Sequence, residues 1–272
     1  MAVQFLFLDL LLLCVYLAKV MYKHSGLTAS SQSPCPTLRR PHRSPVTTHA
    51  TPSPVLQEYY ELLFRTYGPQ KWWPARTRFE VIVGAILTQN TTWTNVERAI
   101  VALRRNRLLS PAALSRISIA KLAPLIRSSG YFRQKARKLK EFVAFLHKHY
   151  GGSLSKLFRT PTPVLREQLL TVHGIGPETA DSILLYAGKH PVFVVDAYTR
   201  RILQRHGLLH GKETYEEIRG LFEGSLPLDP VMFNEFHALL VHLGKHFCRP
   251  KAPLCTACPL QCFLTHPIEG AR

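Results

Sequence analysis

Apolar residues recur at helical spacing through most of this chain, and that pattern excludes most fold classes. The segments with this spacing are Val55–Tyr67, Arg76–Leu87, Thr94–Arg107, Lys121–Ser128, Arg133–Tyr150, Pro163–Val172, Pro177–Ala187, Ala197–Gly207, Lys212–Glu223 and Val231–Phe247, with a short helix from Pro111. Arg76–Leu87 is apolar nearly all round, as expected of a central buried helix. Only Val192–Val195 looks like a strand, and it is too short to form a sheet. We therefore predict an all-α fold.

The charge of the chain points to a polyanionic partner. The 272 residues carry a formal net charge of +18, of which about +14 falls after residue 54. An excess this large on a folded body favours nucleic acid, although basic residues that serve only solubility are the alternative.

The chain is expected to fold only from about Val55 onward. Residues 1–24 open with an apolar run that Asp9 interrupts, so they are either a membrane anchor or the product of a start codon placed too far upstream. No positive charge precedes the run, which makes it a poor signal peptide. We favour the second reading and a cytoplasmic, nucleoid-associated protein. Residues 25–54 are rich in Ser, Thr and Pro and are predicted to be a disordered linker.

The segment His173–Arg201 contains a turn that can bind a phosphate group and an aspartate that can act in catalysis. Gly174, Ile175 and Gly176 lie between two predicted helices, and glycines allow a tight turn and close approach to a ligand backbone. The free N–H groups at the start of the next helix can bind a phosphate oxygen. A plain tight turn is the alternative. Asp196 precedes another predicted helix, where it is either a cap or a catalytic carboxylate.

Four cysteines at the end of the chain form a candidate metal site. Cys248, Cys255, Cys258 and Cys262 lie within fifteen residues, whereas a secreted disulfide scaffold would spread its cysteines. Zinc and a [4Fe–4S] cluster both accept four thiolates, and spacing alone does not decide between them. His242 and His246, one helical turn apart, are further ligand candidates, but they fit the polar face of a helix better.

Together, the hairpin, the aspartate about twenty residues later and the cysteine loop resemble the endonuclease III superfamily of DNA glycosylases. The resemblance covers roughly residues 55–262. It implies two helical lobes, namely a six-helix barrel with the helix-hairpin-helix at 76–189 and a second lobe from 55–75 and 190–272. It also implies a [4Fe–4S] cluster in the loop at 248–262 and a catalytic role for Asp196. Matches around Gln89 and Tyr131 imply that these two residues enter the duplex beside the extruded nucleotide.

The residue at position 178 bears on the type of reaction. Bifunctional members of the superfamily carry a lysine two residues after the second hairpin glycine, and its amine forms a Schiff base with the sugar. Glu178 occupies that position here and cannot form an imine. We therefore predict a monofunctional enzyme in which Asp196 stabilises an oxocarbenium-like sugar and water completes the reaction. Glu178 is either a second charge at the site or a helix-start residue favoured by the dipole.

The tryptophans suggest the damaged base. Trp72, Trp73 and Pro74 precede one predicted helix, and Trp93 follows the Gln89 region. Such residues are often only core, but this layout resembles the 3-methyladenine glycosylases of the superfamily. Indoles favour a cationic ring, and an N-alkylated purine is cationic. We expect a base pocket at these residues, reached by nucleotide flipping.

The expected partner is double-stranded DNA with a damaged base, without a small-molecule substrate and with the protein acting as a monomer. Three alternatives stay open at this point. One is a glycosylase/lyase for oxidised pyrimidines that uses another lysine, the second is a non-catalytic DNA-binding protein, and the third is a membrane protein.

Overall fold

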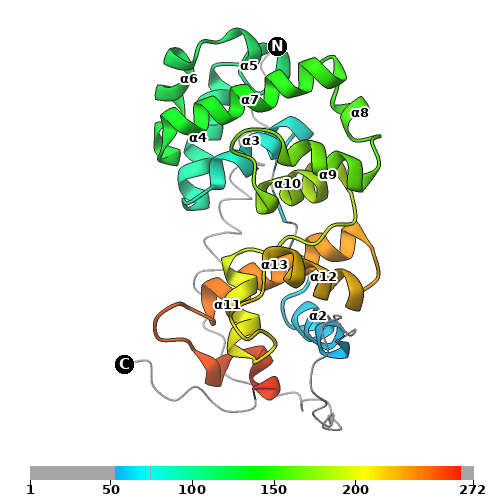
Figure 1. The fold of residues 1–272 in the computed structure, drawn as a ribbon. Coiled ribbons are helices and arrows are strands. Elements are labelled where there is room, and N and C mark those ends of the chain that lie inside the picture. The colour runs from blue at the N-terminus through cyan, green and yellow to red at the C-terminus, as the bar shows by residue number, and fades with distance from the viewer. Residues whose placement is uncertain (1–52, 71, 74, 265–272) are drawn as a thin grey trace, which may run out of the picture. The chain divides into compact units, whose positions relative to one another are not determined.

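The protein was analysed as a computed structural model that describes residues 53–70, 72–73 and 75–264 (Figure 1). Helices joined by loops make up this part of the chain, which contains no strand, so the all-α prediction is confirmed. Residues 192–195 are extended but pair with no strand within the described ranges. The apolar segment 1–24, and the linker 25–54 except for its last two residues, lie outside the described residues.

The helices follow the predicted order closely. The α-helices are α2 (Pro54–Tyr67), α3 (Arg78–Thr88), α4 (Trp93–Arg105), α5 (Pro111–Arg116), α6 (Ile119–Leu125), α7 (Phe132–Tyr150), α8 (Leu154–Leu157), α9 (Thr162–Leu170), α10 (Pro177–Ser182), α11 (Ala197–Arg205), α12 (Tyr215–Ser225) and α13 (Pro230–His246). Short 3-10 helices are η1 (Arg127–Ser129), η3 (Cys255–Ala257) and η4 (Pro259–Phe263), and η2 (Ile183–Gly188) is a π-helix.

Capping side chains decide where several helices begin. Thr77 accepts a hydrogen bond from the Glu80 N–H at 3.1 Å, so α3 starts two residues later than its apolar pattern alone predicts. Thr214 and Glu217 form a capping box, which moves the start of α12 from the predicted Lys212 to Tyr215. In both cases the side chain satisfies an N–H that has no partner within the helix.

Helix α3 is the central buried helix that the sequence predicts. Every residue from Phe79 to Leu87 is buried, and the helix packs on α4, α7, α10 and η2. The one charged residue on this buried stretch, Glu80, is paired with Arg104 at 2.6 Å. An unpaired carboxylate there would carry a large desolvation cost.

Helices α13 and η2 connect the hairpin region to the rest of the body. Helix α13 packs on α2, α11 and η2, while η2 also packs on α3 (Figure 1). The predicted helix 177–187 therefore changes from α to π geometry where it meets both neighbours, and π-turns of this kind are frequent at functional sites. The division into a barrel at 76–189 and a second lobe stays a prediction. None of the described helices has the length and apolar character needed to cross a bilayer.

Candidate active site

The predicted hairpin has the geometry that its glycines suggest. Helix α9 packs on α10, and Gly174 between them has φ +84°, a backbone conformation that favours glycine. A Cβ there would also meet Lys138 Cγ at 2.5 Å. Ile175 is 4% exposed, so it packs into the core as expected, and Gly176 caps α10 ahead of Pro177. The first turn of α10 thus presents backbone N–H groups beside a turn that a phosphate can approach.

Gln89 supports the hairpin from inside the protein. Its amide nitrogen donates to Gly174 O at 3.1 Å and to Thr179 Oγ1 at 2.9 Å, while its Oε1 accepts from Lys138 Nζ at 2.5 Å. These bonds link the end of α3 to the hairpin and to α7. The predicted insertion of Gln89 into the duplex would require them to break, whereas the bridging role needs no change.

Tyr131 is better placed to reach DNA. Its side chain is 68% exposed, and its backbone adopts a left-handed conformation with φ 43° directly before α7. A large aromatic side chain held outward on a strained loop residue is typical of a contact surface.

Asp196 is a helix cap whose second oxygen faces the imidazole of His237. Oδ1 accepts from the Thr199 N–H at 2.8 Å, which confirms the capping interpretation. Oδ2 lies 3.5 Å from His237 Nε2. Burial alone would raise the pKa of Asp196, but His237 and the Thr199 N–H favour the carboxylate more strongly and hold that pKa below its usual value.

Glu178 faces the same region from α10. Burial raises the pKa of Glu178, and the neighbouring charge of Asp196 raises it further, while His237 opposes both. The Glu178 side chain is nevertheless exposed to solvent. The Glu178 carboxylate is thus surrounded by protein atoms but still accessible to water, as expected of a residue that lines a concave surface. The two carboxylates therefore differ in proton affinity, which is the arrangement that separates an ionised stabiliser from a proton acceptor.

His237 and Tyr186 belong to this site, although sequence reasoning did not find them. His237 Nδ1 is 2.6 Å from the Tyr186 hydroxyl, and both side chains are buried. A histidine on the apolar helix α13 was the only available signal, and nothing in the sequence links it to a tyrosine 51 positions away.

The predicted pocket residues form an aromatic cluster beside His237. The Trp73 ring stacks on Tyr186 at 4.9 Å and meets Trp93 edge-on at 5.3 Å, while Trp72 meets His237 edge-on at 6.2 Å. All three indoles are half-buried, so they are neither fully core nor surface. Gly84 leaves room for the Trp73 indole, because a Cβ there would lie 3.0 Å from it. Pro74 lies outside the described residues.

A cavity of about 230 Å³ opens on one side of this cluster. Trp72 and Trp73 line it together with the cationic side chains Arg76, Arg78 and Lys189, and no carboxylate is among its lining residues. Asp196, Glu178 and Trp93 do not line it either. The cavity is therefore poorly suited to a cationic ligand.

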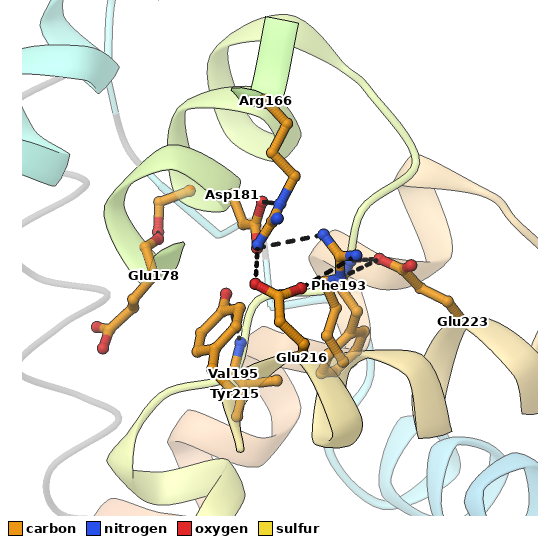
Figure 2. A network of polar contacts seen from close by, with 10 residues as sticks. Arg166, Glu178, Asp181, Phe193, Val195, Tyr215, Glu216 and Glu223 are labelled. Atoms are coloured by element: carbon orange, nitrogen blue, oxygen red, sulfur yellow. Dashed lines mark hydrogen bonds and ion pairs between the residues drawn. The ribbon is translucent and has the colours of Figure 1, made fainter. Parts of the chain in front are cut away.

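A network of ion pairs fixes the hairpin helix and the segment before Asp196 (Figure 2). Asp181 on α10 accepts from Arg166 at 2.7 and 3.1 Å, and Arg166 also pairs with Glu216 on α12 at 2.6 Å. On the same helix, Glu223 accepts from the Phe193 N–H at 2.9 Å. Figure 2 shows Glu178 pointing away from this network. Helix α10 therefore directs the Asp181 carboxylate toward the network and the Glu178 carboxylate away from it.

The cysteine loop contains the predicted metal ligands, but its described residues are not arranged as a metal site. Cys248, Cys255 and Cys258 are free thiols, and Cys262 is disulfide-bonded. Burial raises the pKa of Cys258 to about 11, and the Cys248 and Cys255 thiols raise it as well, which places these three sulfurs close enough to interact. Arg205 Nη1 donates to Cys248 Sγ at 3.2 Å. Within the described residues no group of three or more metal-ligating side chains, His242 and His246 included, is arranged to hold an ion.

The family model of the HhH-GPD superfamily of base excision DNA repair proteins matches residues 83–227. The chain belongs to this family. The match covers the predicted hairpin, Glu178 and Asp196, and it confirms the resemblance to endonuclease III-type glycosylases that the sequence motifs indicated. The protein is therefore a DNA N-glycosylase of base excision repair.

Individual relatives are similar over most of the chain. A Methanocaldococcus jannaschii protein named "Putative DNA repair glycosylase" is 46% identical over 211 residues, covering 77% of this chain and 95% of its own. Endonuclease III of Thermotoga maritima is 32% identical over 194 residues, with 71% and 84% covered. Among solved structures, a 3-methyladenine DNA glycosylase of H. pylori bound to 1,N6-ethenoadenine matches with a TM-score of 0.59 at 28% identity, with 70% and 95% covered.

Proposed function

We propose that this glycosylase is monofunctional: it releases an N-alkylated purine by hydrolysis and leaves an abasic site. The observation that carries the proposal is the pair of carboxylates, Asp196 and Glu178, which lie close enough for the charge of Asp196 to raise the pKa of Glu178. Glu178 stands where a bifunctional enzyme needs an amine, and a carboxylate cannot form a Schiff base. The Lys138 ammonium, the lysine that the structure places at the hairpin, is bound to Gln89.

In the proposed reaction the bond between C1′ and the base nitrogen breaks first, and the electron pair leaves with the base. A cationic alkylated purine departs as a neutral molecule, so it needs no proton from the protein. The ionised Asp196 carboxylate stabilises the positive charge that develops on the sugar. Water then bonds to C1′ and transfers its proton to a carboxylate, for which Glu178, with its raised pKa, is the better acceptor.

The surroundings of the carboxylates support a cationic base. Tyr186 lies close enough to Asp196 and Glu178 for both charges to raise its pKa, and its ring stacks on Trp73, which meets Trp93 edge-on. Aromatic rings and acidic groups both attract a cation. The H. pylori relative, named for 3-methyladenine and bound to an ethenoadenine, supports the same class of substrate.

The protein is proposed to bind double-stranded DNA through the hairpin and Tyr131. Gly174 and Gly176 let the backbone approach a phosphate, and the first turn of α10 supplies the donors. Ile175 contributes by packing the turn onto the core. Tyr131 is proposed to enter the duplex, where it occupies the space that the flipped nucleotide leaves.

The cysteine loop is proposed to hold a [4Fe–4S] cluster through Cys248, Cys255, Cys258 and Cys262. The Cys248 and Cys255 thiols raise the pKa of Cys258, which a bound metal centre would relieve, and Cys262 can join them once it is reduced. Such a cluster would stabilise the loop against α11. We expect anaerobically purified full-length protein to contain about four iron and four acid-labile sulfide atoms. Cys258→Ser should lose the iron, and zinc in its place would contradict the proposal.

The function is tested with the full chain and a panel of duplexes that carry alkylated, oxidised or deaminated bases. Base release and strand scission are assayed separately, and borohydride is added to trap any imine. We expect base release from alkylated purines, with abasic sites as the product and no covalent protein–DNA adduct. A lysine-bearing glycosylase/lyase serves as the positive control for borohydride trapping. A trapped adduct would overturn the monofunctional assignment. Release from oxidised pyrimidines alone would overturn the substrate.

A further inference from the structure

The mechanism above leaves one buried ionisable side chain at the site without a role. His237 is 5% exposed, and the Trp72, Tyr186 and Phe193 rings surround it at centroid distances of 5.9 to 6.5 Å. An imidazole in such apolar surroundings is costly unless its nitrogens have partners. Both partners available to it belong to the candidate site.

We propose that His237 is a positioning residue for the reaction: Tyr186 donates to its Nδ1, and its Nε2–H holds the Asp196 carboxylate in the orientation that faces the sugar. The inference rests on the proposed role of Asp196 and extends it to a Tyr186–His237–Asp196 chain of contacts. No motif of the sequence contains this chain, because its members come from three different helical elements.

The tautomer follows from the Asp196 and Tyr186 contacts. Burial raises the pKa of Tyr186 well above its usual value, and the charge of Asp196 adds to the effect, so the phenol keeps its proton. The Asp196 carboxylate, which can only accept, faces Nε2, so Nε2 is the nitrogen that carries the proton and Nδ1 accepts from the Tyr186 hydroxyl across 2.6 Å. A neutral imidazole whose Nδ1 accepts must carry its own proton on Nε2. Nε2–H then points toward the carboxylate, as the contact geometry requires.

Asp196 is held at both oxygens. The backbone N–H of Thr199 binds Oδ1 at 2.8 Å, and His237 Nε2 lies 3.5 Å from Oδ2. Nε2 has no shorter hydrogen bond within the described part of the chain. The contact to Oδ2 is longer than an ordinary hydrogen bond, so a small movement of α13 or α11 on DNA binding would complete it.

The ionisable groups that face His237 come from each packed element. They are Asp196 at the start of α11, Tyr186 on η2 and Glu178 on α10. The Nε2–H of His237 stabilises the Asp196 carboxylate and lowers its pKa, so removal of this donor should raise the pKa of Asp196. A purely structural histidine could be replaced without that effect, so the pH dependence separates the two roles.

The first experiment measures single-turnover base release by the full chain on a duplex with one 3-methyladenine, which is cationic in DNA. His237→Asn removes the Nε2 donor, whereas His237→Gln keeps an amide donor near that position. We expect His237→Asn to slow release roughly 10- to 100-fold, less than the 10²–10³ lost with a donor in direct contact with reacting atoms. DNA affinity should stay within about twofold. His237→Gln should recover part of the rate, and Tyr186→Phe should slow release less than His237→Asn.

The second experiment tests the His237–Asp196 contact without any DNA substrate. The Asp196 side-chain ¹³C resonance, assigned by its loss in Asp196→Asn, is titrated in the wild type and in His237→Asn. We expect a higher pKa for Asp196 in the variant. We also expect that adding His237→Asn to Asp196→Asn slows base release no further, because His237 acts through the missing carboxylate.

An unchanged ¹³C titration, or an additive double variant, would overturn the inference. Should Asp196→Asn alone leave base release intact while His237→Asn still shifts the titration, the proposed function fails and the His237–Asp196 contact stands. Thermal unfolding of each variant identifies any that does not fold, and Tyr186→Phe, which removes one hydroxyl, then provides the test.

Discussion

Replacing Asp196 with asparagine should reduce the rate of base release by roughly 10³-fold, within the range that single electrostatic groups contribute to catalysis. The asparagine side-chain oxygen can still accept from the Thr199 N–H, so the cap of α11 is retained. What the substitution removes is the negative charge that faces the developing cation. The loss should therefore appear in single-turnover base release and not in the melting temperature or in DNA affinity.

Asp229→Asn is the matched control for this prediction. Asp229 also caps a helix, α13, and its Oδ1 accepts from the Val231 N–H at 2.8 Å, but it is exposed and makes no contact with the site. The same chemical change at a cap without catalytic function should leave base release unchanged. If both variants release the base at the wild-type rate, Asp196 is only a cap and the catalytic assignment is wrong.

The ionisation of Asp196 and Glu178 predicts how activity depends on pH. The pKa of Asp196 is held below its usual value and that of Glu178 is raised above its usual value. As the pH falls, Glu178 therefore gains its proton first, while Asp196 is still ionised. If Glu178 accepts the proton of water, activity should fall through the pKa of Glu178 and not through that of Asp196. A Glu178→Gln variant should lack this limb and show a lower plateau.

Local sequence rules predict the parts of the structure that local interactions determine. The positions of most helices follow from apolar spacing, and the Asp196 cap follows from an aspartate before a helix. The tight turn at Gly174 and the burial of Ile175 follow from the Gly-Ile-Gly pattern between two helices. In each case the residues that make the interaction are a few positions apart.

Local sequence rules did not predict contacts between segments that are far apart in the sequence. Gln89 has the sequence context of a residue that enters DNA, yet its amide binds the hairpin 85 positions later. The pairing of Tyr186 with His237 depends on how η2 packs on α13, and periodicity cannot give that packing. The tryptophans illustrate both limits, because their position at a helix start was informative while the neighbours of each ring were not.

Removing the buried carboxylate of Asp181 should destabilise the protein by about 3 kcal/mol, the cost typical of breaking a buried ion pair by deleting one partner. The Asp181 side chain is fully buried and binds Arg166 through two oxygens, with Arg219 3.9 Å away (Figure 2). Burial raises the pKa of Asp181, although the hydrogen bonds and charge of Arg166 lower it. The loss in Asp181→Ala comes from the arginine charges that stay behind without their buried partner.

Glu216→Gln provides the matched control within the same network. Glu216 binds the same Arg166 guanidinium at 2.6 Å, but its side chain is 49% exposed, so water can replace it. We expect this variant to lose less than about 1 kcal/mol, as exposed ion pairs do. Chemical denaturation of both variants at neutral pH measures the difference. Equal losses would mean that burial of Asp181 adds nothing, and the network would then be an ordinary surface cluster.

Asp181→Ala should also slow base release, because the network holds the chain that leads to Asp196, the proposed catalytic carboxylate. The Tyr215 hydroxyl contacts both Asp181 and the Val195 N–H, the latter at 3.4 Å, and Val195 directly precedes Asp196 (Figure 2). A loosened Tyr215 would let Asp196 move relative to Glu178 on α10. We expect roughly a 10-fold slower single turnover, since small misplacements of reacting groups are costly. A variant that is destabilised but fully active would show that the Thr199 and His237 contacts position Asp196 without the network.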